Sequence, residues 1–423
     1  MQKILIIGHN YYPELTGIGK YTAEFGTYMA NKNGFDVEVI TGKPHYPQWK
    51  VFDGHKNRFF STEIVKGVKL HRVPMFIPKT PNGFKRLIMD ALFIFNAWLV
   101  LNYLLIRGKK YDMVFTPVPS FALGLLSLYY RLFVRQSKLV YHVQDLQIDM
   151  AKEMNMIKSP ALLSLLEKIE KFIIKRVDFV STISPGMASK IKEKVNREVI
   201  NFPNWANITH FFPIKNKEAL KQEWGFDAQD KIVLYSGNIG EKQGLEQILN
   251  IAEMFKPKPN VKFIICGSGA YKAVLLKSAK AKELENVIFL PLQATDVFNN
   301  FLNLADLHLI LQKKDASDLV LPSKLTTILA VGGLVVATAN KGTSLYNEIN
   351  DNEIGILAQP EDDIQLFDAI NEGLAQSHTQ LKFNARQYAE QNISQEGIMQ
   401  RFMKTVDLEV SEIPLPEVLG ALV

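Results

Sequence analysis

A proline, a serine and a lysine open one predicted helix of this 423-residue chain, in the segment LVLPSKLTTILAVGG at 319–333. Pro322 suits a helix start because its missing N–H would have no partner there. Ser323 adds a hydroxyl and a free backbone N–H, and Lys324 places a cation in the first turn. Because a cation opposes the positive end of the helix dipole, we expect Lys324 to need an anion nearby. A solvated lysine beside a helix cap is the alternative.

Glycine-rich loops follow three predicted strands, where they would lead into helices. They read GHNYYPELTGIGKYTAEF at 8–25, SGNIGEKQGLEQIL at 236–249 and CGSGAYKAVL at 266–275. Backbone N–H groups and helix N-termini at such junctions attract phosphate. A lone glycine pair is weak support, because tight turns need glycine regardless of ligand. Three such loops in two domains predict a bound nucleotide, while none places a complete G-x-G-x-x-G as a dinucleotide-binding dehydrogenase requires.

Short β-branched segments alternate with helical segments along the chain, which is typical of parallel sheets built from βαβ units. A polar segment at 205–222 separates an earlier from a later series. The predicted fold class is therefore α/β, with two doubly wound, Rossmann-like domains facing each other across a cleft. The expected strands are 3–8, 36–42, 111–117, 138–144, 178–184, 198–203, 231–237, 261–267, 286–292, 307–312 and 334–339.

The net charge of +6 is divided unevenly along the chain. Residues 1–205 contain 29 Lys and Arg against 16 Asp and Glu, whereas residues 206–423 contain 20 against 27. This asymmetry supports two domains and predicts that the first faces an anionic surface, either a membrane leaflet or nucleic acid. The hydrophobic content of 47% excludes a disordered chain, and the single cysteine, Cys266, excludes a disulfide framework.

The apolar segment at 87–106, LIMDALFIFNAWLVLNYLLI, has about the length that crosses the hydrocarbon core of a bilayer. Asp90, Asn96 and Asn102 interrupt it and basic residues lie on both sides, so a spanning helix is poorly supported. The alternatives are a core helix and a helix lying on anionic lipid, and we favour such peripheral attachment. Because no signal peptide precedes the first strand, the expected location is the cytoplasmic face of the bacterial inner membrane.

Six segments in combination carry a family resemblance: GHNYYPELTGIG, YHVQDL, STISPGM, FPNW, SGNIGEKQGLEQIL and DLVLPSKLTTILAVGG. Together they resemble retaining, family 4 glycosyltransferases of the GT-B fold, in particular the colanic acid biosynthesis type and related fucosyl- and N-acetylfucosaminyl-transferases. The resemblance covers about residues 1–405. It implies an acceptor-side domain at 1–205, a nucleotide-sugar-binding domain at 206–385, and terminal helices at 386–423 that return to the first domain.

The resemblance also implies a set of donor-binding residues. In this sequence they are Gly17, Gly19, Gly237, Asn238, Leu292, Asp318, Pro322, Ser323 and Thr327. Gly17 and Gly19 would approach the donor diphosphate from the first domain, and Ser323 would close the phosphate pocket from the second. Leu292 would contact the base through its backbone, and Asp318 and Thr327 would reach the donor sugar and the ribose.

Two departures from the family pattern fall in the phosphate-binding segments. Asn238 stands where members usually carry arginine, and Lys242 is shifted by one position. The usual two glutamates, eight residues apart, are replaced by Leu319 and Thr327. These substitutions are also what an inert relative of the family would show.

The expected catalytic residues are Asp145, Gln144, Lys242 and Lys324. No D-x-D pair follows a strand, so no metal and no cofactor are expected, and the two lysines would stabilise the leaving diphosphate. Asp145 follows a buried strand where many relatives carry His-Asp, although a helix cap would explain it too. His142, two residues before Gln144, is better explained as a core histidine.

The leading hypothesis is transfer of fucose or N-acetylfucosamine from a UDP- or GDP-linked donor to a lipid-linked oligosaccharide. A sugar-nucleotide epimerase of the GT-B fold and an inert membrane- or nucleic-acid-binding module remain as alternatives, although no nucleic acid partner is expected. An aromatic cluster at Tyr11, Tyr12, Tyr46 and Trp49, with His45, would suit an acceptor sugar. Ordinary packing explains this cluster nearly as well.

Overall fold

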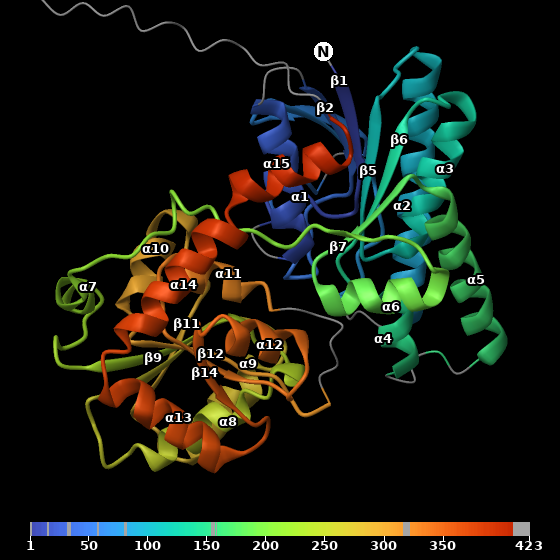
Figure 1. The fold of residues 1–423 in the computed structure, drawn as a ribbon. Coiled ribbons are helices and arrows are strands. Elements are labelled where there is room, and N and C mark those ends of the chain that lie inside the picture. Colours follow the sequence, from blue (N-terminus) through green and yellow to red (C-terminus); the bar gives the residue numbers. More distant parts are fainter. Residues whose placement is uncertain are drawn as a thin grey trace, which may run out of the picture. The chain divides into compact units, whose positions relative to one another are not determined.

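The computed structural model describes residues 2–14, 17–31, 35–56, 59–79, 83–153, 157, 159–315 and 322–408, with Phe84 and Lys242 described by their backbone alone. The chain divides into two compact units, whose elements are labelled in Figure 1. Unit 1 contains residues 1–183 and 188–202 and the chain from residue 400 on. Unit 2 contains residues 184–187 and 203–399.

Unit 1 is built on an eight-stranded sheet in the order β3-β4-β2-β1-β5-β6-β7-β8. All neighbouring strands are parallel except the antiparallel pair of β3 and β4. The carboxyl ends of β1, β2, β5 and β6 therefore share one edge, where a parallel sheet binds its ligands. The strands are β1 (Gln2–Ile7), β2 (Phe35–Thr41), β3 (Ser61–Val65), β4 (Val68–Arg72), β5 (Met113–Val118), β6 (Lys138–Val143), β7 (Phe179–Thr182) and β8 (Ile200–Asn201).

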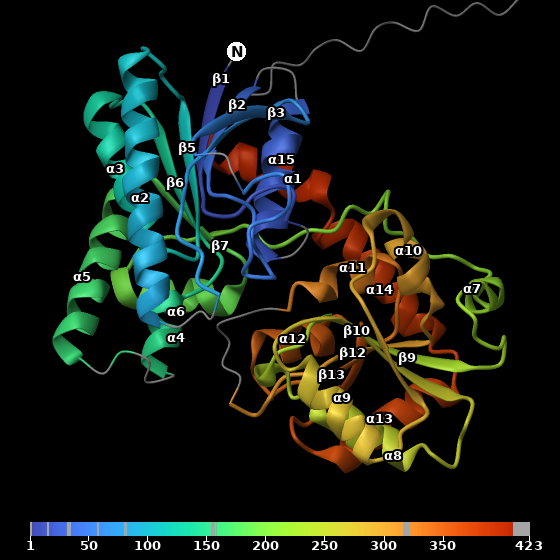
Figure 2. The same ribbon diagram turned by 180° about the vertical axis from the view of Figure 1, so that it is seen from behind.

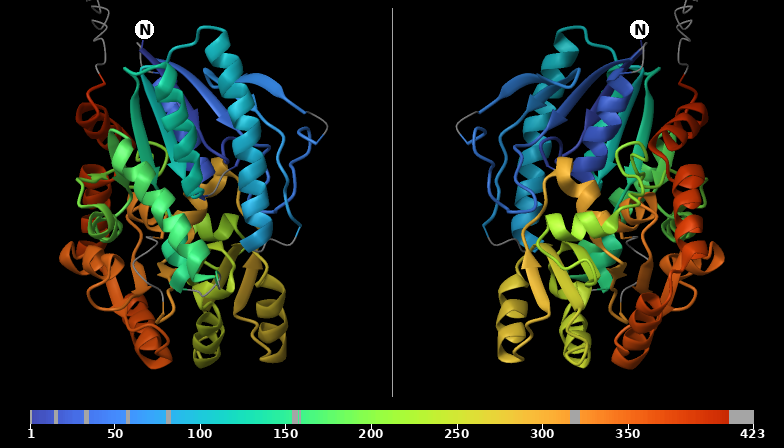
Figure 3. Two further views of the ribbon diagram at one scale, coloured as in Figure 1. Left: turned by 90° about the vertical axis from the view of Figure 1, so that its right-hand side faces the viewer. Right: turned by 90° about the vertical axis from the view of Figure 1, so that its left-hand side faces the viewer.

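Helices cover both faces of this sheet. α1 (Gly17–Asn31) lies on one face, and α2 (Gly83–Ile106), α3 (Gly124–Phe133) and α5 (Pro160–Arg176) lie on the other (Figures 1 and 2). α2 and α3 lie side by side on this face, as the left view of Figure 3 shows. The remaining elements are the short turn η1 (Phe121–Leu123) and the helices α4 (Gln147–Glu153) and α6 (Pro185–Val195).

The hairpin of β3 and β4 was not predicted from the sequence. A two-residue turn at Lys66 and Gly67, with φ of 51° and 83°, joins these strands. Two consecutive positive φ angles define the turn that suits the twist of a hairpin, and Gly67 adopts such an angle without strain. The dipeptide Lys-Gly between two β-branched segments was the available signal.

Unit 2 is built on a six-stranded parallel sheet in the order β11-β10-β9-β12-β13-β14. The sequence analysis placed all of these strands except β14, which is only four residues long and begins with glycine. The strands are β9 (Lys231–Asn238), β10 (Val261–Ser268), β11 (Val287–Leu290), β12 (Leu307–Ile310), β13 (Val335–Thr338) and β14 (Gly355–Ala358).

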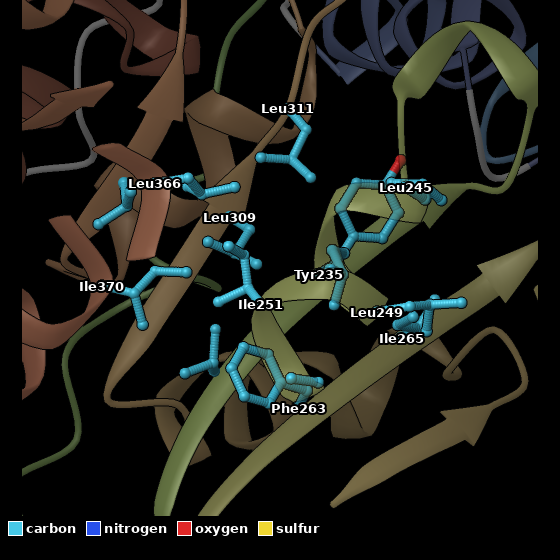
Figure 4. Packing of buried hydrophobic residues seen from close by; sticks show 14 of the residues in the cluster. Tyr235, Leu245, Leu249, Ile251, Phe263, Ile265, Leu309, Leu311, Leu366 and Ile370 are labelled. Carbon is cyan, nitrogen blue, oxygen red and sulfur yellow. The ribbon is translucent and has the colours of Figure 1, made fainter. Parts of the chain in front are cut away.

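The core of unit 2 lies between this sheet and one layer of helices (Figure 4). Tyr235 and Phe263 from the strands pack with Leu249 and Ile370 from the helices, and all four are buried. The helices of the core layer are α8 (Glu246–Met254), α9 (Lys272–Ala281) and α13 (Asp363–Ala375); the others are α7 (Lys217–Glu223), η2 (Glu241–Gln243), α10 (Thr295–Leu304), α11 (Lys324–Ala330) and α12 (Ser344–Asp351).

The last two helices belong to different parts of the fold. α14 (Thr379–Asn392) stays in unit 2, because Arg386 donates hydrogen bonds to the carbonyl oxygens of Phe211, at 2.8 Å, and Ala330, at 2.5 Å. α15 (Gln395–Thr405) enters unit 1, where the ring of Phe402 stacks on Phe202 at 4.1 Å. The segment 386–423, expected to return as a whole, therefore joins unit 1 only from residue 400. Residues 409–423 lie outside the described part.

Candidate functional site

The end of β9 and the start of α11 bring Lys324 against the backbone of Gly237. The Lys324 Nζ lies 3.6 Å from the centre of the Tyr235 ring. A Cβ atom at Gly237 would approach this Nζ to 3.3 Å, and its φ of 151° also favours glycine. The Tyr235 hydroxyl donates a 2.7 Å hydrogen bond to the carbonyl oxygen of Asn238. The tyrosine therefore both supports the ammonium group and shapes the turn after the strand.

The ammonium group of Lys324 is buried. Its Nζ has no hydrogen-bond partner among the described residues. Burial lowers the pKa of Lys324 from 10.5 to about 7, because the charged form loses its hydration. The electron-rich face of Tyr235 offers only partial compensation. An anion bound beside Nζ would restore the charged form, which makes this the strongest anion-binding feature that the structure shows in unit 2.

Glycines also allow β10 to pass close to the end of β9. A Cβ at Gly267 would lie 1.9 Å from the Gly237 carbonyl oxygen, and one at Gly269 would lie 2.1 Å from the Ile239 oxygen. Both glycines have φ angles, 154° and 157°, that other residues rarely adopt. The sequence CGSG contained this signal, which the sequence analysis used only as a loop marker.

The other predicted donor residues of unit 2 are spread over several elements. Ser323 is the exposed N-cap of α11, so Pro322 precedes the cap instead of occupying the first helical position as expected. Thr327 is buried, and its hydroxyl donates to the Lys324 carbonyl oxygen at 3.1 Å. Leu292 is exposed beyond β11, two strands from β9 in the sheet. Asp318 and the Lys242 side chain lie outside what the structure describes.

In unit 1, Glu14 organises the loop between β1 and α1. This buried carboxylate accepts hydrogen bonds from the backbone N–H groups of His45, at 2.7 Å, and Tyr46, at 2.9 Å. A Cβ at Gly19 would approach Glu14 Oε2 to 2.7 Å, so the glycine is needed for this close fit. Gly17 begins α1 with a φ of 61°. Gly19 thus packs against a carboxylate that was not predicted from the sequence, whereas Gly17 lies beside the Tyr46 ring.

Asp145 and Gln144 follow β6 at the carboxyl edge of the sheet of unit 1, and they differ in burial. Asp145 is half-buried, and burial raises its pKa from 3.8 to about 6. Gln144 is buried, with its Nε2 3.2 Å from His142 Nε2. His142 in turn contacts Ser181 Oγ at 3.0 Å, and burial lowers its pKa to about 3. The geometry therefore favours Asp145 for chemistry and supports the interpretation of His142 as a neutral core residue.

The aromatic cluster is only partly a surface. Tyr46 and His45 pack against Trp49 with ring centres 6.4 Å and 5.8 Å apart, and the Arg86 guanidinium lies 5.0 Å from the Trp49 ring. Tyr11, like His45, is buried, so its expected place in a sugar-binding platform is wrong. Its hydroxyl occupies the space that a side chain at Gly26 would need.

In the described ranges, no group of three or more His, Cys, Asp and Glu side chains is arranged to hold a metal ion. Both units are Rossmann-like, and each gathers its candidate residues at the carboxyl ends of parallel strands. Two Rossmann-like units are the architecture of the GT-B class, and each unit contains candidate site residues of its own.

Comparisons with known proteins agree with this class. Residues 16–205 match the family described as "Glycosyl transferase 4-like domain", and residues 216–392 match "Glycosyl transferases group 1". The putative colanic acid biosynthesis glycosyl transferase WcaI of Escherichia coli (strain K12) is 37% identical over 418 residues, which are 96% of this chain and 99% of the relative. The chain therefore belongs to the family 4 glycosyltransferases of the GT-B fold.

Solved structures show the same fold at low sequence identity. The sucrose-phosphate synthase from Thermosynechococcus elongatus superposes with a TM-score of 0.76 at 17% identity, covering 96% of this chain and 98% of the other. Anabaena Alr3699/HepE in complex with UDP and glucose gives a TM-score of 0.70 at 15% identity, covering 97% and 100%. The expected GT-B fold class is thus confirmed.

Proposed function

We propose that this protein transfers a sugar of the fucose or N-acetylfucosamine class from a UDP- or GDP-linked donor to a lipid-linked oligosaccharide. The product would enter a surface polysaccharide of the colanic acid, O-antigen or capsule type. The 37% identical relative is described as a colanic acid biosynthesis glycosyl transferase, which supports this pathway class. The sugar class and the lipid-linked acceptor rest on the sequence resemblance.

The observation that carries the proposal is the unpaired ammonium of Lys324. A lysine that loses its hydration without gaining a partner destabilises the folded chain, so a ligand is its natural counterpart. The diphosphate of a nucleotide sugar supplies an anion of the right charge, and Gly237 leaves room for it close to the backbone. A structural neighbour binds UDP and glucose according to its description, which supports this ligand class.

The proposed mechanism is retaining and independent of metal. As the bond between the donor sugar and the diphosphate breaks, negative charge grows on the phosphate oxygens, and Lys324 stabilises that charge. The leaving phosphate accepts the proton of the attacking hydroxyl on the same face of the sugar. Asp145, ionised above pH 6, orients that hydroxyl from unit 1. The proposed transfer reaction uses no cofactor.

Donor binding is expected to stabilise the folded protein in the presence of EDTA. A ligand that binds only the native state at about 100 times its Kd adds roughly 2.7 kcal/mol. The measurement is thermal unfolding with a panel of UDP- and GDP-sugars, and the nucleotide class that shifts Tm identifies the base. A shift that requires added divalent metal would contradict the metal-free mechanism alone.

The same panel separates the alternatives. Isomerisation of the donor sugar without an acceptor would identify an epimerase. The absence of any shift in folded protein, together with salt-sensitive binding to nucleic acid or vesicles, would indicate an inert binding module. Either result would overturn the proposed transferase.

We also propose that unit 1 binds the cytoplasmic face of the bacterial inner membrane peripherally. The segment Lys85–Ile106 of α2 is long and apolar enough to cross a membrane, yet only 28% of its most apolar window is buried. Exposed cations, Arg86 and Arg107, lie at its two ends, which suits an anionic leaflet. The outward residues that support this surface are Leu92, Phe95, Trp98, Leu99, Tyr103 and Ile106.

Replacing Phe95 and Trp98 together with serine is expected to weaken binding to vesicles roughly 10–100-fold, because each loses apolar area otherwise buried in lipid. The two rings stack on the exposed face of α2, so the change leaves the core of unit 1 intact. Sedimentation with vesicles containing phosphatidylglycerol measures the effect. Phe383→Ser, which removes an exposed ring of unit 2, is the matched control. Equal sedimentation of all variants would contradict the membrane face.

A further inference from the structure

Three polar side chains interrupt the apolar sequence of α2, and the structure gives two of them a structural task. Asn96 Nδ2 donates to the Pro74 carbonyl oxygen at 2.9 Å. Asn102 Nδ2 donates to the Trp98 carbonyl oxygen at 2.8 Å, and its Oδ1 accepts from the Tyr129 hydroxyl at 2.7 Å. These two amides therefore join α2 to the rest of unit 1. The third, Asp90, differs from both.

Asp90 faces His9 at the carboxyl end of β1. Its Oδ1 lies 3.5 Å from His9 Nε2, and their side chains are 13% and 3% exposed. The His9 Nε2 has no hydrogen-bond partner in the part of the chain that the structure describes. Phe93 lies about one helical turn after Asp90 on α2, and its ring packs on the imidazole with ring centres 4.1 Å apart. An imidazole nitrogen without a hydrogen-bond partner among the described residues thus lies beside a carboxyl group, and both are largely shielded from water.

This pair is not an ordinary buried ion pair. Burial, with a smaller effect from His45, lowers the pKa of His9 to about 3, so the imidazole is neutral. Burial raises the pKa of Asp90 to about 6. The hydroxyl of Ser120 and the positive charge of Arg86 partly oppose this rise, and the carboxyl group is ionised at pH 7.5. A neutral imidazole gives a carboxylate little of what it loses on leaving water. The fold therefore keeps a hydrogen-bonding site there at a net free-energy cost.

The position of the pair indicates its ligand. His9 begins the loop that leads to Glu14 and Gly17, so it lies at the ligand-binding edge of the parallel sheet. Arg86 lies one helical turn before Asp90 and covers the face of Trp49. A carboxylate oxygen and an imidazole nitrogen side by side match the neighbouring hydroxyl groups of a sugar, which need hydrogen-bond partners.

We propose that His9 and Asp90 form an acceptor subsite of unit 1, in which Asp90 accepts a hydrogen bond from a hydroxyl of the acceptor sugar and His9 Nε2 contacts the same or the adjacent hydroxyl. This inference rests on the proposed transferase function and deepens it. It assigns to the apolar helix α2 a second role, because the helix that offers its outer face to lipid also contributes Asp90 to sugar binding. A lipid-linked sugar fits both faces at once.

The test uses octyl β-D-glucoside and octyl β-D-galactoside, below their micelle concentrations, as probes of a lipid-linked sugar. Binding to the full chain is followed by tryptophan fluorescence. We expect saturable binding of at least one glycoside, weakened tenfold or more by Asp90→Asn and by His9→Gln. Thermal stabilisation by the UDP- or GDP-sugar is expected to stay unchanged in both variants, since the proposed donor-binding residues of unit 2 are not altered.

Asn102→Leu is the matched control, because it removes a polar group of the same helix that is fully used by structure. It is expected to lower Tm without changing glycoside affinity. The subsite is overturned if no glycoside binds the wild type, or if Asp90→Asn binds as tightly as the wild type. In either case the proposed function still stands if the donor sugar nucleotide raises the Tm of the wild type. If no donor raises the Tm of the wild type, the proposed function itself is refuted.

Discussion

Lys324→Met is expected to remove most of the transferase activity while making the ligand-free protein more stable. The buried ammonium is proposed to stabilise the leaving diphosphate, and loss of one such preorganised group typically lowers kcat by about 10²–10³. Steady-state kinetics with the donor identified by thermal unfolding measures the effect. Stabilisation of the variant by that donor should also fall. Lys277→Met, on the exposed face of α9, is the control and should leave both quantities unchanged.

The stability of Lys324→Met has a defined dependence on pH. The pKa of Lys324 is about 7 in the folded chain against 10.5 for an ordinary lysine. Between these values the unfolded chain holds a proton that the folded chain lacks, so wild-type stability rises with pH across this window. The variant loses this slope and should exceed the wild type by roughly 2–5 kcal/mol at pH 7 and below. Urea unfolding at pH 6.5 and pH 10 compares the two.

Two results would contradict the assignment of Lys324. A variant that keeps kcat/KM within a few-fold of the wild type would show that the ammonium does not contact the reacting phosphates. A variant that is less stable than the wild type at pH 6.5 would show that Lys324 has a structural partner. Because activity and stability are expected to move in opposite directions, simple misfolding cannot imitate the predicted outcome.

The alternation of strands and helices made the architecture predictable from sequence. Parallel strands covered on both faces are long and uniformly apolar, as the buried residues of β5 and β10 show, so they are recognised without partners. β3, β4 and β14 were not predicted, and the burial of β3 and β14 is mixed. β3 pairs with β4 across a two-residue turn, so the signal that was missed there is the turn itself.

The candidate site was predictable where the backbone itself demands a residue type. Gly237 and Lys324 were singled out from strand ends and a helix start, and the structure brings them into contact. Glu14 and Tyr235 were missed, because a buried carboxylate bonded to a distant loop and a tyrosine beneath a lysine are tertiary contacts. Gln144 and Asp145 are adjacent in sequence, and only burial separates the interior amide from the half-buried acid.

Asp145→Asn is expected to lower kcat by about 10²–10³ with a small change in donor binding, because a neutral amide does not hold and orient the acceptor hydroxyl as strongly as a carboxylate does. Burial raises the pKa of Asp145 to about 6, so wild-type activity should fall as pH decreases through 6 and the carboxylate is lost. Asp53→Asn, which changes an exposed surface acid, is the control and should keep the wild-type rate and profile.

The pH profile and the stability of Asp145→Asn separate a catalytic from a structural role. Asp90 also has a pKa of about 6, so the residual activity should keep any acidic limb that Asp90 causes and lose only the part due to Asp145. The folded chain holds the Asp145 proton up to a higher pH than the unfolded chain, so this group lowers stability as pH rises from about 4 to 6. At pH 7.5 the asparagine variant should therefore be as stable as the wild type or more stable, by about 1–2 kcal/mol. If Asp145→Asn unfolds more easily than the wild type at pH 7.5, Asp145 is a helix cap. If the variant keeps full activity, Asp145 takes no part in the reaction, since a group that orients the acceptor cannot be neutralised without slowing transfer.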